Sequence, residues 1–284
     1  MRLKVALIAL LVLVGIIVAI IVLYGNFRWK ASINELRASM QAVQSSNSIT
    51  IFNSQEIVDL PAPVQRYFTM VLKDGQALVK TAKVTHTGTF NMGDSTEKWV
   101  PFDSTQYIIT QRPGFVWDAR VRLAPGVAVF VHDAYVAGEG FLAAKVLGLF
   151  TVMQQPSSPE LAQGELMRFF AEATWYPTAF LPCQGVQWEA INDTQASAII
   201  RDGSTEVKLI VTFDEQGLIS TVYSDGRYRE VDGVQEETPW EGHFWDYEWQ
   251  DGMLIPQEGE VAWFLPEGPK PYWRGRIQQI EYTF

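Results

Sequence analysis

The chain has 284 residues, 48% of them apolar, which is enough hydrophobic material for the packed core of one large domain. Its single cysteine, Cys183, excludes an intramolecular disulfide and any metal site built from several thiolates. Beyond residue 30, 18 Lys and Arg stand against 32 Asp and Glu, a net charge of about −14. Such a surface repels nucleic acid, which we exclude as a partner.

An uninterrupted apolar segment occupies Val5–Leu23. As a helix, its 19 residues would extend roughly 28 Å at about 1.5 Å each, close to the ~30 Å hydrocarbon core of a bilayer. A cleaved signal peptide is the alternative, but such peptides have a shorter apolar core followed by small residues. Here Tyr24 and Trp29 follow with Arg28 and Lys30, which is typical of the interfacial belt of a retained helix. We therefore predict an uncleaved transmembrane signal anchor.

The charges flanking the anchor do not decide its orientation. Arg2 and Lys4 precede the apolar run, while Arg28, Lys30 and Arg37 follow it. Long domains translocate largely regardless of such charges, and a very short basic tail before a first helix is usually retained inside. We expect a single-pass protein of the cell membrane whose C-terminal body lies outside the cytoplasm.

Two helices are predicted between the anchor and the first strand. Apolar residues recur every three or four positions over Ile33–Val43, which indicates an amphipathic stalk that ends at about Gln44. A second short helix should occupy Pro63–Leu72, since proline favours the first helical turn. We divide the chain into an anchor (1–30), a stalk helix with linker (31–54) and a single β domain (55–284).

The remainder is predicted to be mostly antiparallel strands. Short segments rich in Val, Thr, Ile and aromatic residues alternate with Gly, Pro, Asp and Asn turn signals. The predicted strands are Thr81–Phe90, Thr105–Gln111, Phe115–Leu123, Val127–Tyr135, Phe141–Val152, Val186–Ile191, Gln195–Arg201, Thr205–Phe213, Leu218–Arg229, His243–Trp249, Met253–Phe264 and Tyr272–Tyr282.

One helix interrupts the series of strands. Ser158 is a favourable N-cap and Pro159 suits the first turn, while Pro177 cannot continue the helix, which should end near Trp175. The pattern predicts a mainly β fold of the α+β class. We expect a curved antiparallel sheet or half-barrel with a crossing helix, preceded by one N-terminal transmembrane helix.

Several motifs resemble those of an uncharacterised bacterial family of membrane-anchored proteins with no assigned function. They read LPAPVQRYF from Leu60, PGFVWDARV from Pro113, GELMRFFAEATWYPTAFLP from Gly164 and PWEGHFWDY from Pro239. The closing strands, with FWDYEWQDGMLIPQEGEVAW from Phe244, also resemble bacterial envelope lipoprotein-carrier domains. The resemblance implies a half-barrel around a carrier site, and it assigns no chemistry.

Ten tryptophans in one chain suggest an aromatic binding site. Rings also fill ordinary cores, so each one alone is more simply explained by packing. As a set on a curved sheet, rings at alternate positions would line an apolar concavity of the kind that small ligands occupy. Arg168 either pairs with Glu172, four residues later, or meets an anionic head group. The candidate ligand-binding residues are Phe115, Trp117, Arg168, Trp175, Trp245, Trp263 and Trp273.

Strand alternation separates these rings from neighbouring carboxylates. In regular strands, Trp117 and Asp118 would face opposite sides of the sheet, and so would Trp245 and Asp246. The carboxylates would then belong to the solvated face. A hydrolase would instead need two acids about 5 to 10 Å apart, one with its pKa raised by an apolar wall. The candidate pairs are Glu241 with Asp246 and Asp118 with Glu139.

We infer a membrane-anchored extracytoplasmic domain that binds a lipid or another apolar ligand. An envelope hydrolase using paired carboxylates and a scaffold that binds an envelope protein partner are the alternatives. The sequence lacks a nucleophile elbow, a phosphate-binding glycine loop and an H-x-x-x-H pair, so a role without catalysis is favoured. His86, His132 and His243 fall on separate predicted strands, and we expect neither a metal nor a cofactor.

Overall fold

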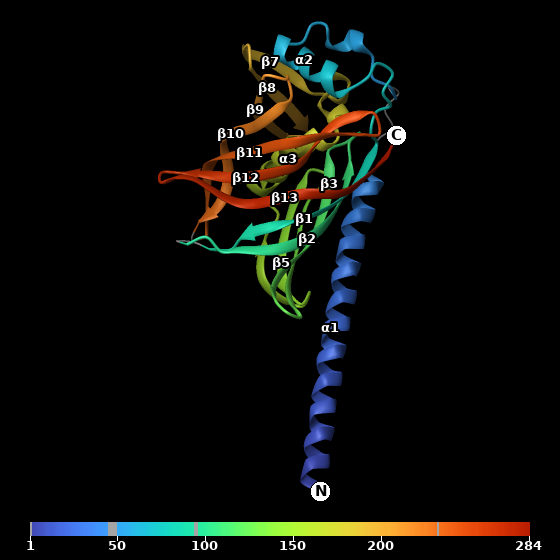
Figure 1. Cartoon of the computed structure of the whole chain (residues 1–284), viewed down its shortest axis with the longest axis vertical. Helices are drawn as coiled ribbons and strands as arrows, with labels where there is room; N and C mark the ends of the chain where they lie inside the picture. Colours follow the sequence, from blue (N-terminus) through green and yellow to red (C-terminus); the bar gives the residue numbers. More distant parts are fainter. Residues whose placement is uncertain (1, 45–49, 94–95, 232) are drawn as a thin grey trace.

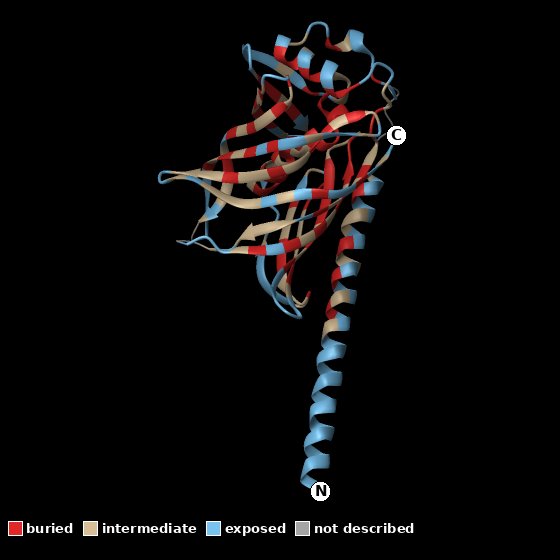
Figure 2. Cartoon of the chain, viewed as in Figure 1, coloured by how far each residue is buried: buried red, intermediate tan, exposed pale blue. Residues whose placement is uncertain are grey.

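The computed structural model describes residues 2–44, 50–93, 96–231 and 233–284 (Figure 1). One long helix, α1 (Arg2–Ala42), leads into the body of the molecule. Its first half projects away from the sheet, with Val5–Leu23 almost entirely exposed (Figure 2). Its most apolar window has a mean hydropathy of 3.5 and is not buried. The helix is therefore long and apolar enough to cross a membrane, as a membrane anchor or a signal sequence would be. Part of the expected linker, residues 45–49, lies outside the described residues.

A single curved sheet of thirteen antiparallel strands forms the body. The strands stand in the order β6-β5-β4-β3-β2-β1-β13-β12-β11-β10-β9-β8-β7, so that β1 and β13 join the two halves of the chain. In the described chain β6 and β7 are the two edges, and the sheet is open. The bounds are β1 (Thr81–Asn91), β2 (Trp99–Ile109), β3 (Gly114–Ala124), β4 (Val127–Val136), β5 (Glu139–Val146), β6 (Phe150–Gln155), β7 (Gln187–Asn192), β8 (Gln195–Asp202), β9 (Thr205–Phe213), β10 (Ile219–Val231), β11 (Val234–Gln250), β12 (Met253–Leu265) and β13 (Gly268–Thr283).

The predicted strand Phe141–Val152 is wrong as a single element, because the chain reverses within it. Leu147 and Gly148 both have positive φ angles, of 53° and 73°, and β5 and β6 form a hairpin around them. Two successive residues with positive φ make the tight reversal that suits the twist of paired strands. The sequence Leu-Gly is a weaker signal for this turn than Asn-Gly, which explains the missed reversal.

Three other strands begin earlier than predicted. β2 begins at Trp99, β11 at Val234 and β13 at Gly268. Pro101 in β2 and Pro269 in β13 interrupt the residue pattern that a strand normally shows, although proline is tolerated where its missing N–H is not needed. The added part of β11 pairs with β10 in a long hairpin; Val234–Glu237 are exposed there, whereas Thr238, Trp240 and Gly242 are buried.

The predicted crossing helix is confirmed as α3 (Pro159–Ala171). The Ser158 hydroxyl accepts a hydrogen bond from the Leu161 N–H at 3.2 Å and caps its first turn. The helix contacts β3, β4 and β5 on one side and β9 and β10 on the other, so it bridges the two halves of the sheet. Three 3₁₀ turns follow it: η2 (Glu172–Trp175), η3 (Pro177–Phe180) and η4 (Pro182–Gln184).

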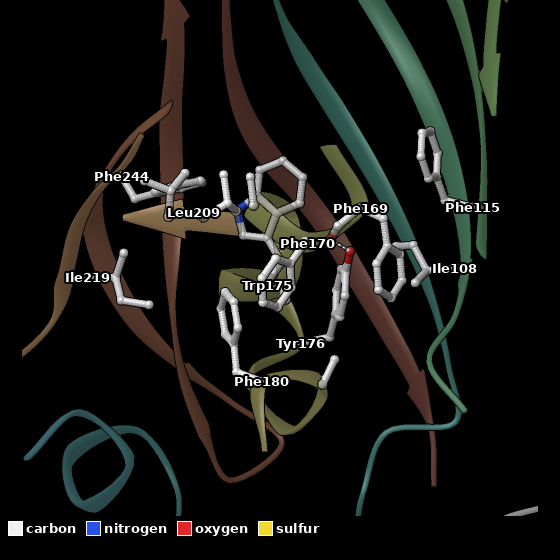
Figure 3. Packing of buried hydrophobic residues seen from close by; sticks show 14 of the residues in the cluster. Ile108, Phe115, Phe169, Phe170, Trp175, Tyr176, Phe180, Leu209, Ile219 and Phe244 are labelled. Carbon is white, nitrogen blue, oxygen red and sulfur yellow. Dashed lines mark hydrogen bonds between the residues drawn. The ribbon is translucent and has the colours of Figure 1, made fainter. Parts of the chain in front are cut away.

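Aromatic rings fill the space between these turns and the sheet (Figure 3). The hydroxyl of Tyr176 donates to the backbone carbonyl of Phe169 at 2.7 Å, which ties the 3₁₀ turn back to α3. Phe180 packs against Phe170 with ring centroids 5.3 Å apart. Two short helices, η1 (Ser54–Ile57) and α2 (Ala62–Val71), close this end of the core, and α2 packs on β8 and β12. The predicted helix at Pro63–Leu72 is thereby confirmed.

The second half of α1 packs on the outer face of the sheet, against β2, β3 and β4. Trp29, Ile33 and Met40 are buried there in a separate cluster with Val116 and Phe130. A Cβ atom on Gly25 would lie 2.1 Å from the backbone oxygen of Leu147, so only glycine permits this close approach. The expected stalk is therefore a docked helix.

Candidate functional site

A cavity of about 550 Å³ lies between α3 and the concave face of the sheet. This volume falls within the roughly 300–1,000 Å³ that is usual for small-molecule sites. Both halves of the sheet contribute to it, together with one side of α3. Its apolar wall residues other than Trp include Phe90, Val121, Val129, Val131, Leu142, Ala144, Phe244 and Val261.

Five tryptophans line this cavity: Trp117, Trp175, Trp240, Trp263 and Trp273. Trp175 stands at the centre of the group, with its ring centroid 6.4 Å from that of Trp273 and 6.3 Å from that of Phe244. Trp263 stacks on Tyr272 at 5.6 Å with an interplanar angle of 19°. The rings thus form a continuous aromatic wall.

The structure brings five of the seven predicted binding residues to the cavity: Trp117, Arg168, Trp175, Trp263 and Trp273. Phe115 faces the same side of the sheet but lies beneath the surface of the cavity, fully buried, with the Arg168 guanidinium 4.9 Å from its ring centroid. It supports Arg168 and does not line the site.

The prediction that Trp245 binds the ligand is wrong, because this residue lies on the outer face of the sheet. Its side chain is 42% exposed, and its indole N–H donates to Glu258 at 2.8 Å. Phe244 takes the inward position instead and lines the cavity. Asp246 has a φ of 59° and bonds to Arg276, which also bonds to Glu258. The local distortion at Asp246 therefore puts it on the same side as Trp245, against the predicted alternation.

Alternation holds on β3, where Trp117 faces the cavity and Asp118 faces α1. Asp118 bonds to Arg120 and accepts the indole N–H of Trp29 at 2.7 Å. None of the four carboxylates predicted to form acid pairs lines the cavity: Asp118, Glu139, Glu241 and Asp246.

A second set of charged residues lies along the α3 side of the cavity, and the sequence analysis predicted only Arg168 and Glu172 of this set. Arg168 bonds to Asp133 on β4 and to Glu172, whose Oε1 is 2.8 Å from the Arg168 Nε. The Gln106 amide donates to Glu172 at 2.5 Å. Burial opposes the charge on Arg168, but Glu172 and Asp133 outweigh it and raise the pKa of the guanidinium above its usual value. The predicted i,i+4 pair of Arg168 with Glu172 is confirmed.

Glu165 and Arg227 form the second part of this charged set. Glu165 is 3% exposed and its Oε1 lies 3.5 Å from Arg227 Nη2. Burial, together with the Asp133 carboxylate, raises the pKa of Glu165 well above its usual value, against the opposing effect of Arg227. Arg227 also donates to the Gly164 carbonyl and to the Tyr272 hydroxyl, each at 3.2 Å. Burial thus favours the neutral form of Glu165.

Several buried polar atoms of the cavity wall have no hydrogen-bond partner among the described residues. They include the indole nitrogens of Trp117 and Trp175 and the Arg229 Nε. A buried polar group without a partner costs about 1–3 kcal/mol. The wall of the cavity therefore contains unpaired N–H donors that are themselves buried, and a ligand reaches them only when the wall side chains shift.

His86 lies behind the aromatic wall, with its ring 4.8 Å from Trp175. Burial lowers its pKa to about 3, and the charge of Arg168 adds to the shift, so this ring is neutral near pH 7. Among the described residues no group of three or more His, Cys, Asp or Glu side chains is arranged to hold a metal ion.

The chain resembles two solved structures at 10% identity. One is a LolA superfamily protein from Nitrosomonas europaea, with a TM-score of 0.39 over 82% of this chain and 94% of that one. The other is a beta-barrel-like protein of the domain of unknown function DUF1849 from Brucella abortus, with a TM-score of 0.23 over 73% and 99%. No curated protein matches the chain. The sequence model of one family matches residues 58–282, and the chain belongs to this family, the family of unknown function DUF6920.

Proposed function

We propose that the protein is a membrane-anchored, extracytoplasmic domain that binds a lipid or another apolar molecule carrying one polar group. The observation that supports this most directly is the cavity of about 550 Å³, with its aromatic and aliphatic wall and its unpartnered indole N–H groups. Apolar walls with a few placed polar groups are characteristic of small-ligand sites. An interior filled with side chains would have favoured the scaffold alternative.

The packing of α1 supports a retained anchor over a cleaved signal. Trp29 is 2% exposed, and its removal would leave Val116, Phe130 and Asp118 on the outer face without their cover. Cleavage just after Leu23 would also free the helix end that holds Gly25 against the β5–β6 turn. We expect the intact N-terminus in mature protein, and an N-terminus mapped beyond Leu23 would contradict the anchor.

The extracytoplasmic orientation has a direct test. Ile191, on β7, is 48% exposed and far from α1, so a cysteine there is accessible. In a Cys183→Ser background, Ile191→Cys should react with a membrane-impermeant maleimide on intact cells. Labelling that occurs only after lysis would place the domain in the cytoplasm.

Ligand binding is tested on the full chain, extracted in mild detergent and analysed by native mass spectrometry with lipid extraction. We expect a co-purifying lipid or amphiphile at near-stoichiometric amount. Ala144→Phe should displace it, because Ala144 lines the cavity and the added ring occupies that space. Trp245→Ala is the matched control, since Trp245 lies on the outer face and its loss should leave the bound amount unchanged. Equal occupancy in both variants would contradict binding in this cavity.

One observation favours a second function, hydrolysis by paired acids. Glu165, whose pKa is raised by burial and by the neighbouring Asp133, lies beside that carboxylate at the cavity wall. A protonated acid next to an ionised one is the arrangement that acid–base hydrolysis requires. Glu165→Gln separates the two functions: a hydrolase would retain its bound substrate and lose turnover, whereas a carrier would show no turnover in either form.

A further inference from the structure

The turns of two hairpins lie at the end of the sheet nearest the exposed half of α1 (Figure 1). One is the β3–β4 turn at residues 124–127 and the other is the β5–β6 turn at residues 147–149. The Leu147 N–H donates to the Ala128 carbonyl at 3.0 Å, and Gly148 packs against the Phe130 ring. The two turns therefore form one structural unit, which we call the hairpin tip.

The hairpin tip has a fixed height relative to α1. Gly25 packs directly on the Leu147 carbonyl and on Leu149, and the apolar run of α1 ends two residues earlier, at Leu23. At about 1.5 Å per residue, the tip lies within roughly 5 Å of the end of that run along the helix axis. A helix that spans the bilayer with Val5–Leu23 would hold the tip at the level of the lipid head groups.

The hairpin tip and the strand residues next to it, above all the start of β6, carry side chains that are unusually apolar for an exposed surface. Phe150 and Val152 on β6 are each 60% exposed, although a soluble protein normally covers such groups. Strand β6 is also an edge of the sheet, so part of its backbone has no neighbouring strand. The exposed apolar residues are Leu123, Val127, Phe150, Val152 and Met153.

This apolar strip continues into the cavity. Val152 and Met153 are both exposed to the surroundings and part of the cavity wall, so β6 frames one side of the opening. The opposite side is framed by Met92 after β1 and by Glu230 and Gln235 of the β10–β11 hairpin, which are also exposed. An apolar path therefore runs from the hairpin tip into the cavity.

Cationic groups lie at the same height. A cavity of about 410 Å³ between α1 and the β5–β6 turn is lined by two cations, Arg28 and Lys145, and one acid, Glu35, together with Tyr24. Positive charges next to an apolar tip suit a bilayer surface that contains anionic lipids. A second protein adding a strand to β6 would have no need of this arrangement.

We infer that the hairpin tip inserts into the head-group layer of the bilayer that α1 spans, and that the ligand enters the cavity from this leaflet along β6. The inference rests on the proposed function, because it takes α1 as the anchor and the cavity as the binding site. On this inference the ligand is a membrane lipid of the leaflet into which the hairpin tip inserts.

Insertion of the tip is tested by depth-dependent quenching on the full chain in vesicles of phosphatidylethanolamine and phosphatidylglycerol. In a Cys183→Ser background, Phe150→Cys carries a bimane label, and Ile191→Cys, on a hairpin at the far end of the sheet, carries the control label. A lipid with a nitroxide near its head group should quench the label at 150 by about twofold more than the label at 191. Equal quenching at both positions would overturn the inference. A protein partner that covers β6 in place of the bilayer would give this result.

The entry route is tested with a pyrene-labelled fatty acid, whose arrival is followed by energy transfer from the tryptophans. Leu123→Asp with Phe150→Asp places charges on the tip and changes no cavity-lining residue. Loading from vesicles should slow by about tenfold, while equilibrium transfer in detergent stays as in the unmodified chain. Unchanged loading with intact binding would overturn the route alone. Absence of transfer in detergent for the unmodified chain would contradict the proposed function, and the quenching result would still decide whether the tip inserts.

Discussion

The indole N–H of Trp29, on α1, donates to the carboxylate of Asp118, on β3, at 2.7 Å. The same Trp ring packs edge-on against Phe130 with centroids 5.7 Å apart. A residue six positions after a membrane-length apolar run is thus tied to the middle of strand β3. This bond fixes the direction in which the domain leaves the helix, and with it the height of the cavity opening.

Loss of this attachment should release the second half of α1 from the sheet. Trp29→Ala removes a buried ring, a change that costs about 3–5 kcal/mol where the site cannot collapse. We expect amide hydrogen exchange over Ile33–Met40 to become faster, while exchange in β9 is unchanged. Phe27→Ala is the control, because Phe27 is 69% exposed and should contribute little. Similar exchange in both variants would show that Trp29 does not hold the helix.

The buried ring of His86 predicts a loss of stability in acid. Its pKa is about 3 in the folded protein against about 6.5 in the unfolded chain, so below pH 6.5 the unfolded state binds the proton more readily. The free energy of unfolding should therefore decrease as the pH falls from about 6.5 towards 3, by up to ~1.4 kcal/mol per unit from this group. Chemical denaturation of the full chain in detergent, at several pH values, measures the slope.

His86→Gln should reduce the slope of the free energy of unfolding against pH by the contribution of one proton, whatever its effect on absolute stability. His243→Gln is the matched control with the opposite sign, since the bonded Glu241 carboxylate raises the pKa of His243. Below the pKa that His243 has in the unfolded chain, the protonated ring stabilises the fold. This stabilisation is lost as the pH rises through the raised pKa of the folded state. An unchanged acid slope in His86→Gln would mean that the ring accepts a proton in the folded state.

The raised pKa of Glu165 predicts that the free energy of unfolding decreases as the pH rises. Burial raises its pKa above the unfolded value, so the folded state holds the proton more tightly and stability falls as the pH rises from about 4.5 through the folded pKa. Glu165→Gln should abolish this decline, because the amide stays neutral. Glu160, at the start of the same helix, is the control: hydrogen bonds from the backbone and Ser158 lower its pKa, so Glu160→Gln should leave the decline intact. If stability still declines with rising pH in Glu165→Gln, another group causes the decline.

Much of the architecture could be predicted because it depends on local signals. The caps and prolines around α3 set its limits, and strand alternation placed Trp117 and Asp118 on opposite faces. The β5–β6 turn was missed because its Leu-Gly sequence carries little turn signal. Trp245 lies on the outer face because alternation along β11 turns Trp240 and Phe244 inward, and the positive φ of Asp246 brings that carboxylate to the same outer face.

The charged set of the cavity could not be predicted from spacing, since it joins residues distant in the sequence. Asp133 comes from β4, Glu165 and Arg168 from α3, and Arg227 from β10. One signal was available: Glu165 lies four residues after Leu161 and four before Phe169, in the middle of the apolar face of α3. A carboxylate in that position must be buried with a partner or protonated.

The unpartnered indole N–H of Trp175 predicts which chemical group the cavity recognises. Trp175→Phe keeps an aromatic ring and removes the donor. A ligand whose polar group accepts that hydrogen bond should bind about 3- to 10-fold more weakly, since such a bond contributes roughly 0.5–1.5 kcal/mol. The stability of the folded protein should change little, because removing an unpartnered buried donor relieves a cost of about 1–3 kcal/mol and so offsets the packing lost with the smaller ring.

Two pyrene probes separate this contact from general apolar packing. A pyrene-labelled fatty acid carries the acceptor, whereas a pyrene-labelled alkane of similar length does not. In Trp175→Phe the affinity for the acid should fall and that for the alkane should stay, while Trp245→Phe, on the outer face, should change neither. An equal loss for both probes would show that Trp175 contributes only its ring surface. The polar end of the ligand would then be bound by the charged set on α3, where Arg168 is the cation that remains charged at every working pH.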